Sequence, residues 1–335
     1  MMRARLSSLR HRAARACSLV FPLTAVVASP ATAQTIAIVS VDAGVPNLGT
    51  VASAASGDTV FRVAPDSGQV TKLSGAGART SGGATRGHVV VTCTGDDACA
   101  SASATVTITH FGSPTGRARA LDNFTIAAGA NPPTLGTPSG TDPITFTLSG
   151  IPRDATRDFY VGADFAIADS GISGLATSGF LVSVTAGALA GTAQATVLRP
   201  LSLGKSFDLS FGTIIAPSSG SGSVTLDAGD ASLDVTGTGA RALNAPAPTL
   251  AQYAVTGEGG QTFSIDMDIE TPVEMTGPGT LEVTLNTNAD ASPILVGLPT
   301  QEGEYSFRVG GSFPIGHDTL AGAYSGTFVV TVLYN

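Results

Sequence analysis

The chain has 335 residues, of which 13% are charged, and a formal net charge of −8 at pH 7. This charged share is about half of the roughly 25% typical of globular proteins. An acidic chain repels phosphate backbones, so the charge argues against nucleic acid as a partner.

Residues 1–33 have the layout of a secretory signal peptide. Five arginines and no acidic residue precede an apolar stretch from about Cys17 to Ala28. Ala33 ends a small-x-small cleavage motif. We predict cleavage between Ala33 and Gln34. The apolar stretch is too short to span a bilayer, and no later stretch reaches the roughly 18 apolar residues of a membrane helix. We therefore expect an exported protein, in the periplasm in transit and then at the cell surface or outside the cell, and not a transmembrane protein.

The rest of the chain contains an internal repeat. Residues 160–184 align with residues 308–332 at a constant offset of 148. Nearer the start of each copy, residues 48–63 align with residues 211–226 at an offset of 163. A repeat on this scale predicts two homologous domains in tandem.

Each copy consists of short apolar or alternating runs separated by Gly, Pro, Asn and Asp. Strands at such intervals, without helical periodicity, predict an all-β fold made of two tandem β-sandwiches. The expected boundaries are a signal peptide at 1–33, a first sandwich at 34–186, a linker at 187–196 and a second sandwich at 197–335.

Two cysteines follow the signal peptide, Cys93 and Cys99, six residues apart. In an oxidising compartment this spacing favours a disulfide that closes a small loop. A metal site with Asp96 and Asp97 as helpers is the weaker alternative, because two thiols without a nearby His pair fall short of a four-ligand site. The shrinking repeat offset predicts about 15 extra residues in the first copy, around this loop and residues 111–140.

No catalytic motif stands out in the sequence. His88, His110 and His317 are isolated from one another, and the chain has no HExxH motif, no G-x-S-x-G motif and no phosphate-binding loop. We therefore predict a protein that is not an enzyme, with no catalytic residue, cofactor or metal. A pair of carboxylates that meets only in the fold, as in glycosidases, is the open alternative.

The last residues of the chain predict a strand, because apolar side chains alternate with period two. One face carries Phe328, Val330, Val332 and Tyr334. The other face, with Val329 and Leu333, is almost as apolar, which predicts burial on both sides.

This terminal pattern resembles the last strand of the subunits of chaperone–usher pili. Those subunits end in an alternating apolar strand with a penultimate aromatic residue and a glycine fourteen residues from the end, positions held here by Tyr334 and Gly322. Residues 197–335 also resemble the bacterial surface domain called domain of unknown function 4402, through the elements DLSFGTI, VTGTGAR and FRVGGSFPI. The first copy repeats these elements more weakly.

The resemblance implies incomplete immunoglobulin-like, pilin-like sandwiches. A periplasmic chaperone would complete such a sandwich first, an usher would follow, and a strand of another pilin-like subunit or of a second copy would replace the chaperone. The groove residues it implies are Gly322, Phe328, Val330, Val332 and Tyr334, with Tyr334 near the mouth. The alternative is a complete sandwich in which residues 329–334 form a central strand.

These observations favour a secreted, non-enzymatic structural protein, a fimbrial-type subunit that assembles by β-strand complementation. The alternatives are a two-domain tip adhesin that mediates cell adhesion, and a secreted binding protein that does not polymerise. We expect residues 193–198 to fold back against 179–185 and complete the first sandwich in cis. Residues 35–41 are either a donor peptide or the first strand.

Overall fold

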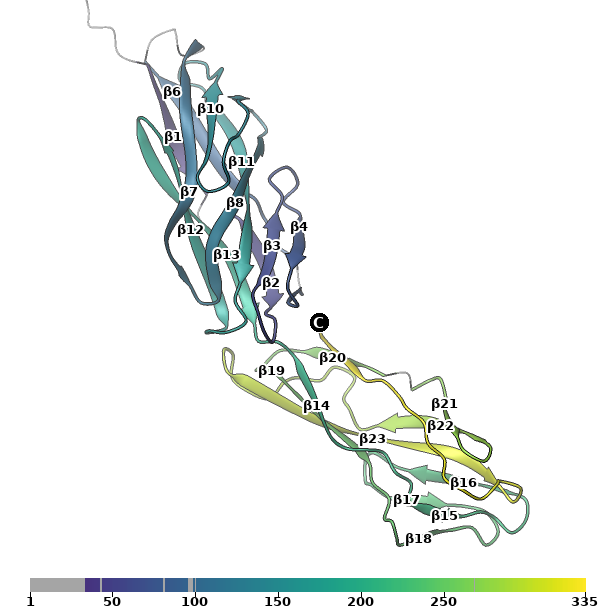
Figure 1. The fold of residues 1–335 in the computed structure, drawn as a ribbon. Helices are drawn as coiled ribbons and strands as arrows, with labels where there is room; N and C mark the ends of the chain where they lie inside the picture. The colour runs from purple at the N-terminus through teal and green to yellow at the C-terminus, as the bar shows by residue number, and fades with distance from the viewer. Residues whose placement is uncertain (1–33, 43, 81, 96–98, 100, 268) are drawn as a thin grey trace, which may run out of the picture.

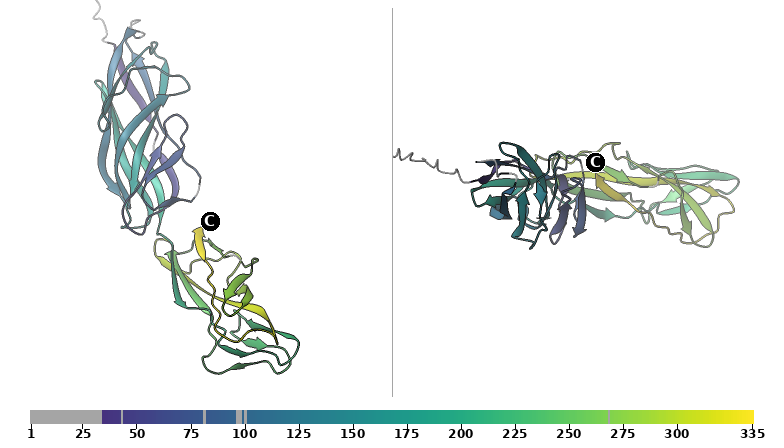
Figure 2. Two further views of the ribbon diagram at one scale, coloured as in Figure 1. Left: turned by 45° about the vertical axis from the view of Figure 1, so that its right-hand side comes forward. Right: turned by 90° about the horizontal axis from the view of Figure 1, so that it is seen from above.

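The computed structural model describes residues 34–335 except 43, 81, 96–98, 100 and 268. The expected signal peptide, Ala33 included, and the two aspartates of the alternative metal site lie outside the described residues. The described chain forms two bodies placed end to end, each with its own hydrophobic core (Figures 1 and 2). We call them the N-terminal unit, residues 34–198, and the C-terminal unit, residues 201–335.

Strands make up the regular structure of both units, which confirms the all-β prediction, and the described residues contain no α-helix. In the same residues we find no helix with the length and apolar character needed to cross a membrane.

The N-terminal unit contains two sheets. One has the order β1-β6-β11-β3-β4, and β8 pairs with the other side of β11. Its strands are β1 (Thr35–Val41), β3 (Thr59–Val63), β4 (Val70–Ser74), β6 (Gly87–Thr94), β8 (Ala118–Ala128) and β11 (Thr156–Ile167). The other sheet has the order β5-β2-β13-β12-β7-β10-β9. Its strands are β2 (Asn47–Ala52), β5 (Ala78–Arg79), β7 (Ser103–Thr115), β9 (Thr134–Leu135), β10 (Ile144–Ser149), β12 (Gly174–Val184) and β13 (Gly187–Leu198).

Alternating side chains hold these two sheets together. In β12, Ala176, Ser178, Phe180 and Val182 are buried, whereas the alternate residues 177, 179 and 181 are partly exposed. Across the core, the rings of Phe146 on β10 and Phe159 on β11 meet edge to face, 5.5 Å between centroids. Each such buried side chain contributes about 1.5–3 kcal/mol, so the shared core stabilises the pair of sheets.

The C-terminal unit repeats this arrangement on a smaller scale. Its main sheet has the order β14-β19-β23-β16-β17, and β22 joins β23 to β21. The strands of this sheet are β14 (Ser202–Phe207), β16 (Ser221–Leu226), β17 (Leu233–Val235), β19 (Ala251–Glu258), β21 (Val273–Thr276), β22 (Thr280–Thr287) and β23 (Glu302–Gly316). Two further pairs are β15 (Thr213–Ile215) with β18 (Arg241–Leu243) and β20 (Phe263–Asp266) with β24 (Thr331–Tyr334).

Most strands of the two units correspond in order, as the internal repeat predicts. The order β1-β6-β11-β3-β4 matches β14-β19-β23-β16-β17, and the pair β2–β5 matches β15–β18. At the offset of 148, β12 corresponds to the terminal segment, residues 322–332. The strand β13 has no counterpart among the described residues of the C-terminal unit.

The segment that we expected to be a linker, residues 187–196, lies in β13. β12 turns directly into β13, and the two form a hairpin that runs from the pair Gly174–Val197 to the pair Val184–Gly187. The predicted pairing of residues 193–198 with 179–185 was wrong: residues 193–197 fold back in cis against 174–178, and residues 187–192 pair with 179–184. Alanine and glycine dominate this stretch and have weak strand propensity, which is why the sequence looked like a linker.

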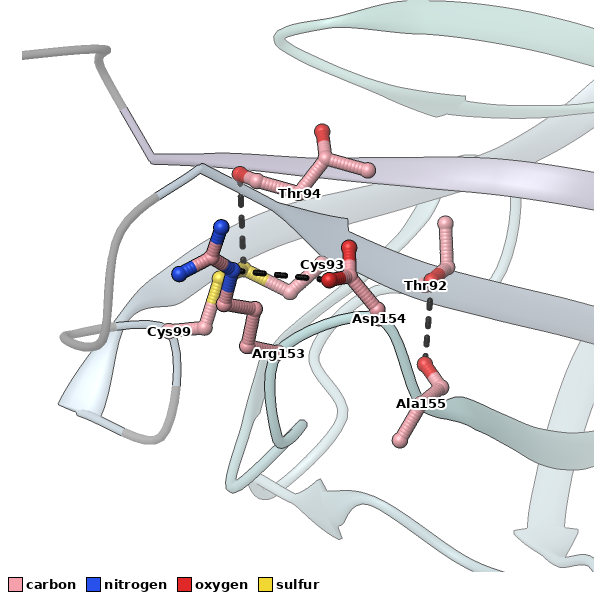
Figure 3. Close-up of a disulfide and its surroundings, with 7 residues drawn as sticks. All are labelled: Thr92, Cys93, Thr94, Cys99, Arg153, Asp154 and Ala155. Atoms are coloured by element: carbon pink, nitrogen blue, oxygen red, sulfur yellow. Dashed lines mark hydrogen bonds and ion pairs between the residues drawn. A yellow bond between two sulfur atoms is a disulfide. The ribbon is translucent and has the colours of Figure 1, made fainter.

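The predicted disulfide between Cys93 and Cys99 is present at the end of β6 (Figure 3). Both cysteines are fully buried. Beside them, the carbonyl of Cys93 accepts a hydrogen bond from the backbone N–H of Asp154 at 2.9 Å, and Thr92 Oγ1 donates to the carbonyl of Ala155 at 2.9 Å. The disulfide thus closes the loop that follows β6, next to the hydrogen bonds by which β6 contacts residues 154 and 155 just before β11.

The extra length of the N-terminal unit lies mainly after β8. The chain between β8 and β11 spans residues 129–155 and contains β9 and β10, whereas the chain between β22 and β23 spans only residues 288–301. The chain from the start of β7 to the end of β8, residues 103–128, is about as long as that from β20 to β22, residues 263–287. This insertion therefore begins later than the start of the predicted region 111–140 and overlaps its end.

Candidate functional site

In the N-terminal unit, β13 fills the space between β12 and β2. It runs antiparallel to β12 and parallel to β2, where Val197 pairs with Val51 and Leu198 with Ala52. On its inner face, Ala193, Ala195 and Val197 are buried. A strand with small inner side chains therefore seals this part of the core.

The packing of β13 on Phe180 requires a glycine at position 191. Phe180 is fully buried, and a Cβ atom on Gly191 would overlap both its ring and the side chain of Val41. The strand runs so close to its neighbours that the absence of a side chain decides whether it fits.

In the C-terminal unit, the corresponding place is an open groove of about 900 Å³. One wall consists of residues 208–216, which include β15, and the other consists of residues 319–328. β15 pairs with β18, and no strand of the described residues pairs with its other side. The groove therefore lies where β13 lies in the N-terminal unit.

The floor of the groove is the hydrophobic core of the C-terminal unit. Among the core residues that line the groove are Tyr253, Met275, Val283, Leu285, Phe313 and Ile315. From the first wall, Phe211 packs edge to face on Phe313 at 4.9 Å between ring centroids. Because apolar surface in water costs about 25 cal/mol per Å², this groove favours an apolar occupant.

Among the described residues that line the groove, the charged ones are Lys205 and Asp208. They form an ion pair with each other, and the hydrogen bond from Lys205 to Asp208 raises the pKa of the lysine. Burial raises the pKa of Tyr253, so its hydroxyl is neutral at pH 7. An uncharged, extended segment is the kind of ligand that this lining accommodates.

The second wall belongs to the terminal segment that the resemblance singled out. Gly322 and Phe328 line the groove, whereas Val330, Val332 and Tyr334 pack on the core beyond its end. The five residues are thus on one segment and on one side of the core, but only two of them border the open space.

One face of the terminal segment is partly buried against the core and the other is exposed, so the prediction of two buried faces was wrong. Val329 is 78% exposed and Leu333 is 59% exposed, whereas Phe328 and Val330 pack against the core. No described residues form a second layer over this outer face, and in the plane of the sheet the end of the segment pairs with β20.

Among the described residues, few backbone hydrogen bonds hold the second wall in place. Ser325 exchanges both of its backbone hydrogen bonds with Thr276, and the ladder with β20 begins only at Thr331. The edge that faces the groove pairs with no strand among the described residues. Such an edge is a template for β-strand addition.

Tyr324 is a groove residue that we did not predict. At the offset of 148 it takes the place of Ala176, which is fully buried beneath β13. Tyr324 lines the groove, and its hydroxyl donates a hydrogen bond to the carbonyl of Leu320 at 2.8 Å. The sequence feature that could have identified Tyr324 is the replacement of a small residue, Ala176, by a large one at the same position of two otherwise similar repeats.

The histidines named from the sequence do not line the groove. His88 Nδ1 lies 3.1 Å from Asp42 Oδ2, and its Nε2 lies 3.2 Å from Asp158 Oδ2. His317 Nδ1 lies 3.2 Å from the carbonyl oxygen of Gly220. In the part of the chain that the structure describes, no three His, Cys, Asp or Glu side chains gather as metal ligands would.

Residues 201–334 match the family described as a domain of unknown function, DUF4402. The match supports the resemblance seen in the sequence for residues 197–335 and includes both walls of the groove. It spans less than half of the chain and leaves the N-terminal unit outside. No curated protein matches this chain.

Proposed function

We propose that this chain is a secreted, non-enzymatic surface protein of the fimbrial type, which joins an assembly when a partner's β-strand enters the groove of the C-terminal unit. One observation carries this proposal: in the N-terminal unit of the same chain, β13 occupies the corresponding place. The chain therefore contains a filled and an open version of one architecture.

The filled version indicates how the partner's strand would lie. It would run antiparallel to residues 322–332 and parallel to β15, as β13 runs relative to β12 and β2. Backbone hydrogen bonds to both walls would supply affinity, and small alternate side chains over the floor would supply register. The partner is another pilin-like subunit or a second copy, with a periplasmic chaperone and an usher acting before assembly.

A tip adhesin is the second candidate, and the pairing of β1 favours it. Thr35–Val41, the segment considered as a donor peptide, pairs with β6 from Thr35–Thr94 to Val41–Val89. A subunit whose residues 35–41 stay in their own sheet can accept a strand but does not donate this one. Such a subunit would stand at the end of an assembly. The N-terminal unit would then face outward and carry the receptor-binding surface.

Binding of a synthetic peptide tests the groove directly. We expect the full chain to bind a fluorescent peptide with the sequence of residues 187–198, GALAGTAQATVL, in a saturable manner. The same peptide with leucine in place of its second glycine, the counterpart of Gly191, should bind at least about tenfold more weakly, because one large side chain in a packed site costs about 1–3 kcal/mol.

Two protein variants locate the binding. Ile214→Lys places a charge in the groove and should abolish peptide binding, because Ile214 lines it. Val329→Lys adds the same charge to the exposed outer face and should leave binding unchanged. A wild-type chain that does not bind the peptide, or equal binding by both variants, would contradict the proposal.

An SDS gel without boiling, blotted from intact surface extracts, separates the two candidates. A ladder of multiples that collapses to one band on boiling supports a polymerising subunit. A single larger species that also collapses supports a terminal position. A band at the monomer mass in both lanes would argue against assembly through an inserted strand.

A further inference from the structure

The two units meet at a junction built around one buried carboxylate. Glu258, at the end of β19, is 3% exposed. Its Oε1 accepts hydrogen bonds from Ser173 Oγ at 3.0 Å and from the backbone N–H of Thr300 at 2.6 Å. Its Oε2 accepts one from the backbone N–H of Arg199 at 3.2 Å. One side chain thus joins the N-terminal unit, the connection and the C-terminal unit.

The N-terminal unit presents Ser173 from a loop that Arg117 holds in place. Arg117 Nε donates to the carbonyl of Gly171 at 3.1 Å, and its Nη1 donates to the carbonyl of Asp169 at 3.0 Å. Burial, and then repulsion by Arg199, lower the pKa of Arg117. Arg117 of the N-terminal unit therefore holds the loop between β11 and β12 in place, and this loop positions Ser173 against Glu258.

Tyr334 connects this junction to the groove. Its hydroxyl accepts a hydrogen bond from the backbone N–H of Glu258 at 2.7 Å and donates one to the carbonyl of Arg199 at 3.0 Å. Burial raises the pKa of Tyr334, which keeps the hydroxyl protonated and able to donate. Gly257 makes room for it, since a Cβ atom there would overlap the hydroxyl oxygen.

The same chain segment that ends at Tyr334 begins as the second wall of the groove. Between the pair of hydrogen bonds at Ser325 and the start of β24 at Thr331, no ladder is described for this segment. Its course along the groove therefore depends on how firmly its two ends are held.

We propose that the junction and the groove are coupled: the closed junction holds the end of the groove wall through Tyr334, so Ser173, Glu258 and Tyr334 act as positioning residues for strand capture. The coupling follows from the Tyr334 hydroxyl, which is hydrogen-bonded to the backbone of two junction residues, Glu258 and Arg199. Its role in strand capture rests on the proposed function. The N-terminal unit thereby positions the groove wall of the C-terminal unit, although no β-ladder joins the two units among the described residues.

The polar partners of the Glu258 carboxylate are all donors: Ser173 Oγ, the backbone N–H groups of Thr300 and Arg199, and the Arg199 guanidinium, whose Nε lies 3.7 Å from Oε2. An amide in its place has one donor end, which would face either Ser173 and Thr300 or the backbone N–H of Arg199. Glu258→Gln therefore preserves volume while it breaks the junction on one side. Ser173→Ala is the milder variant, since it removes a single hydrogen bond from the other unit.

Amide hydrogen exchange of the full chain tests the coupling. We expect residues 331–335 to exchange about fivefold faster in Ser173→Ala, which removes one hydrogen bond to the carboxylate, and about tenfold or more faster in Glu258→Gln, which leaves donors on one side without an acceptor. Ser183→Ala is the matched control, since Ser183 Oγ donates to the carbonyl of Thr107 at 3.3 Å within the N-terminal unit. It should leave the exchange of residues 331–335 unchanged.

Peptide binding completes the test and keeps the two proposals apart. We expect Ser173→Ala to weaken binding of the GALAGTAQATVL peptide about fivefold and Ser183→Ala to leave it unchanged. Faster exchange in a chain that binds no peptide would support the coupling and contradict the proposed function. Normal peptide binding with unaltered exchange in both junction variants would overturn the coupling and leave the proposed function intact.

Discussion

β12 and the terminal segment have aligned sequences but different surroundings. Phe180 on β12 is fully buried beneath β13, whereas its counterpart Phe328 is partly exposed at the wall of the groove. Both side chains pack toward a core, Phe180 from within β12 and Phe328 from the stretch just before β24. The comparison teaches that an apolar pattern predicts which face of a segment points inward. How completely that face is covered depends on whether a neighbouring strand is present.

The largest expected effect comes from supplying the missing strand to the C-terminal unit. A fusion variant carries the sequence of residues 187–198 after Asn335, joined by a flexible linker of about 6 residues. We expect it to stabilise the C-terminal unit by about 5 kcal/mol, equivalent to burying two or three more apolar side chains. Differential scanning calorimetry measures the shift. A fusion with the same residues in scrambled order is the control, and equal stabilisation by both would refute the correspondence.

Truncation of the two aligned phenylalanines compares the filled and open sites directly. Phe180→Ala should destabilise the N-terminal unit by about 4 kcal/mol, because it opens a cavity in a closed core. Phe328→Ala should cost the C-terminal unit about 2 kcal/mol, since part of that side chain is already in water. Denaturant unfolding gives both values. Val329→Ala, on the exposed outer face, should stay within about 0.5 kcal/mol of wild type, and a larger cost would mean that this face is covered.

Glycine 191 allows a sharper test of how closely the filling strand packs. Gly191→Ala should destabilise the N-terminal unit by about 2 kcal/mol, because the added methyl group overlaps the Phe180 ring. Gly204→Ala on β14 is the matched control, since a Cβ atom there meets only the carbonyl oxygen of Ala254 at 3.8 Å. Urea unfolding followed by circular dichroism compares the two. Equal effects would show that the space around Gly191 relaxes.

The smallest effect concerns pH and is confined to the N-terminal unit. Burial alone would raise the pKa of Asp158, but hydrogen bonds from the backbone N–H groups of Asn131 and Ala130, together with His88, lower it. A depressed pKa stabilises the fold above the ordinary value of about 3.9, and this stability is lost as the pH falls through the lower folded value.

Wild type should therefore lose about 1 kcal/mol more than Asp158→Asn between pH 5 and about pH 2. Urea unfolding at the two pH values measures the difference. Asp154→Asn, at a carboxylate whose side chain is 70% exposed, is the control and should follow wild type. A parallel pH dependence in wild type and Asp158→Asn would contradict the assignment.

Much of the fold was predictable because it depends on local patterns and on similarity within the chain. The repeat offsets anticipated the matched strand orders, and the spacing of Cys93 and Cys99 anticipated the disulfide. β13 escaped prediction because Ala193 and Ala195 have neither the bulk nor the propensity that marks a strand. They bury well only because β2 and β12 lie on either side of them.

The candidate site was predicted in part. Gly322 and Phe328 follow from the terminal pattern, but Tyr324 and the opposite wall at residues 208–216 come from segments far apart in sequence. Glu258 gave no signal at all, because an acidic residue at the end of a strand is ordinarily solvated.

The sequence by itself determined the all-β class, the duplication, the inward face of the terminal segment and the disulfide, because each follows from spacing along the chain. Only the tertiary structure decided that β13 fills one copy while the other is open, and that Glu258 and Tyr334 join the two units. These features depend on which distant segments become neighbours, and burial and hydrogen bonding are properties of neighbours in space.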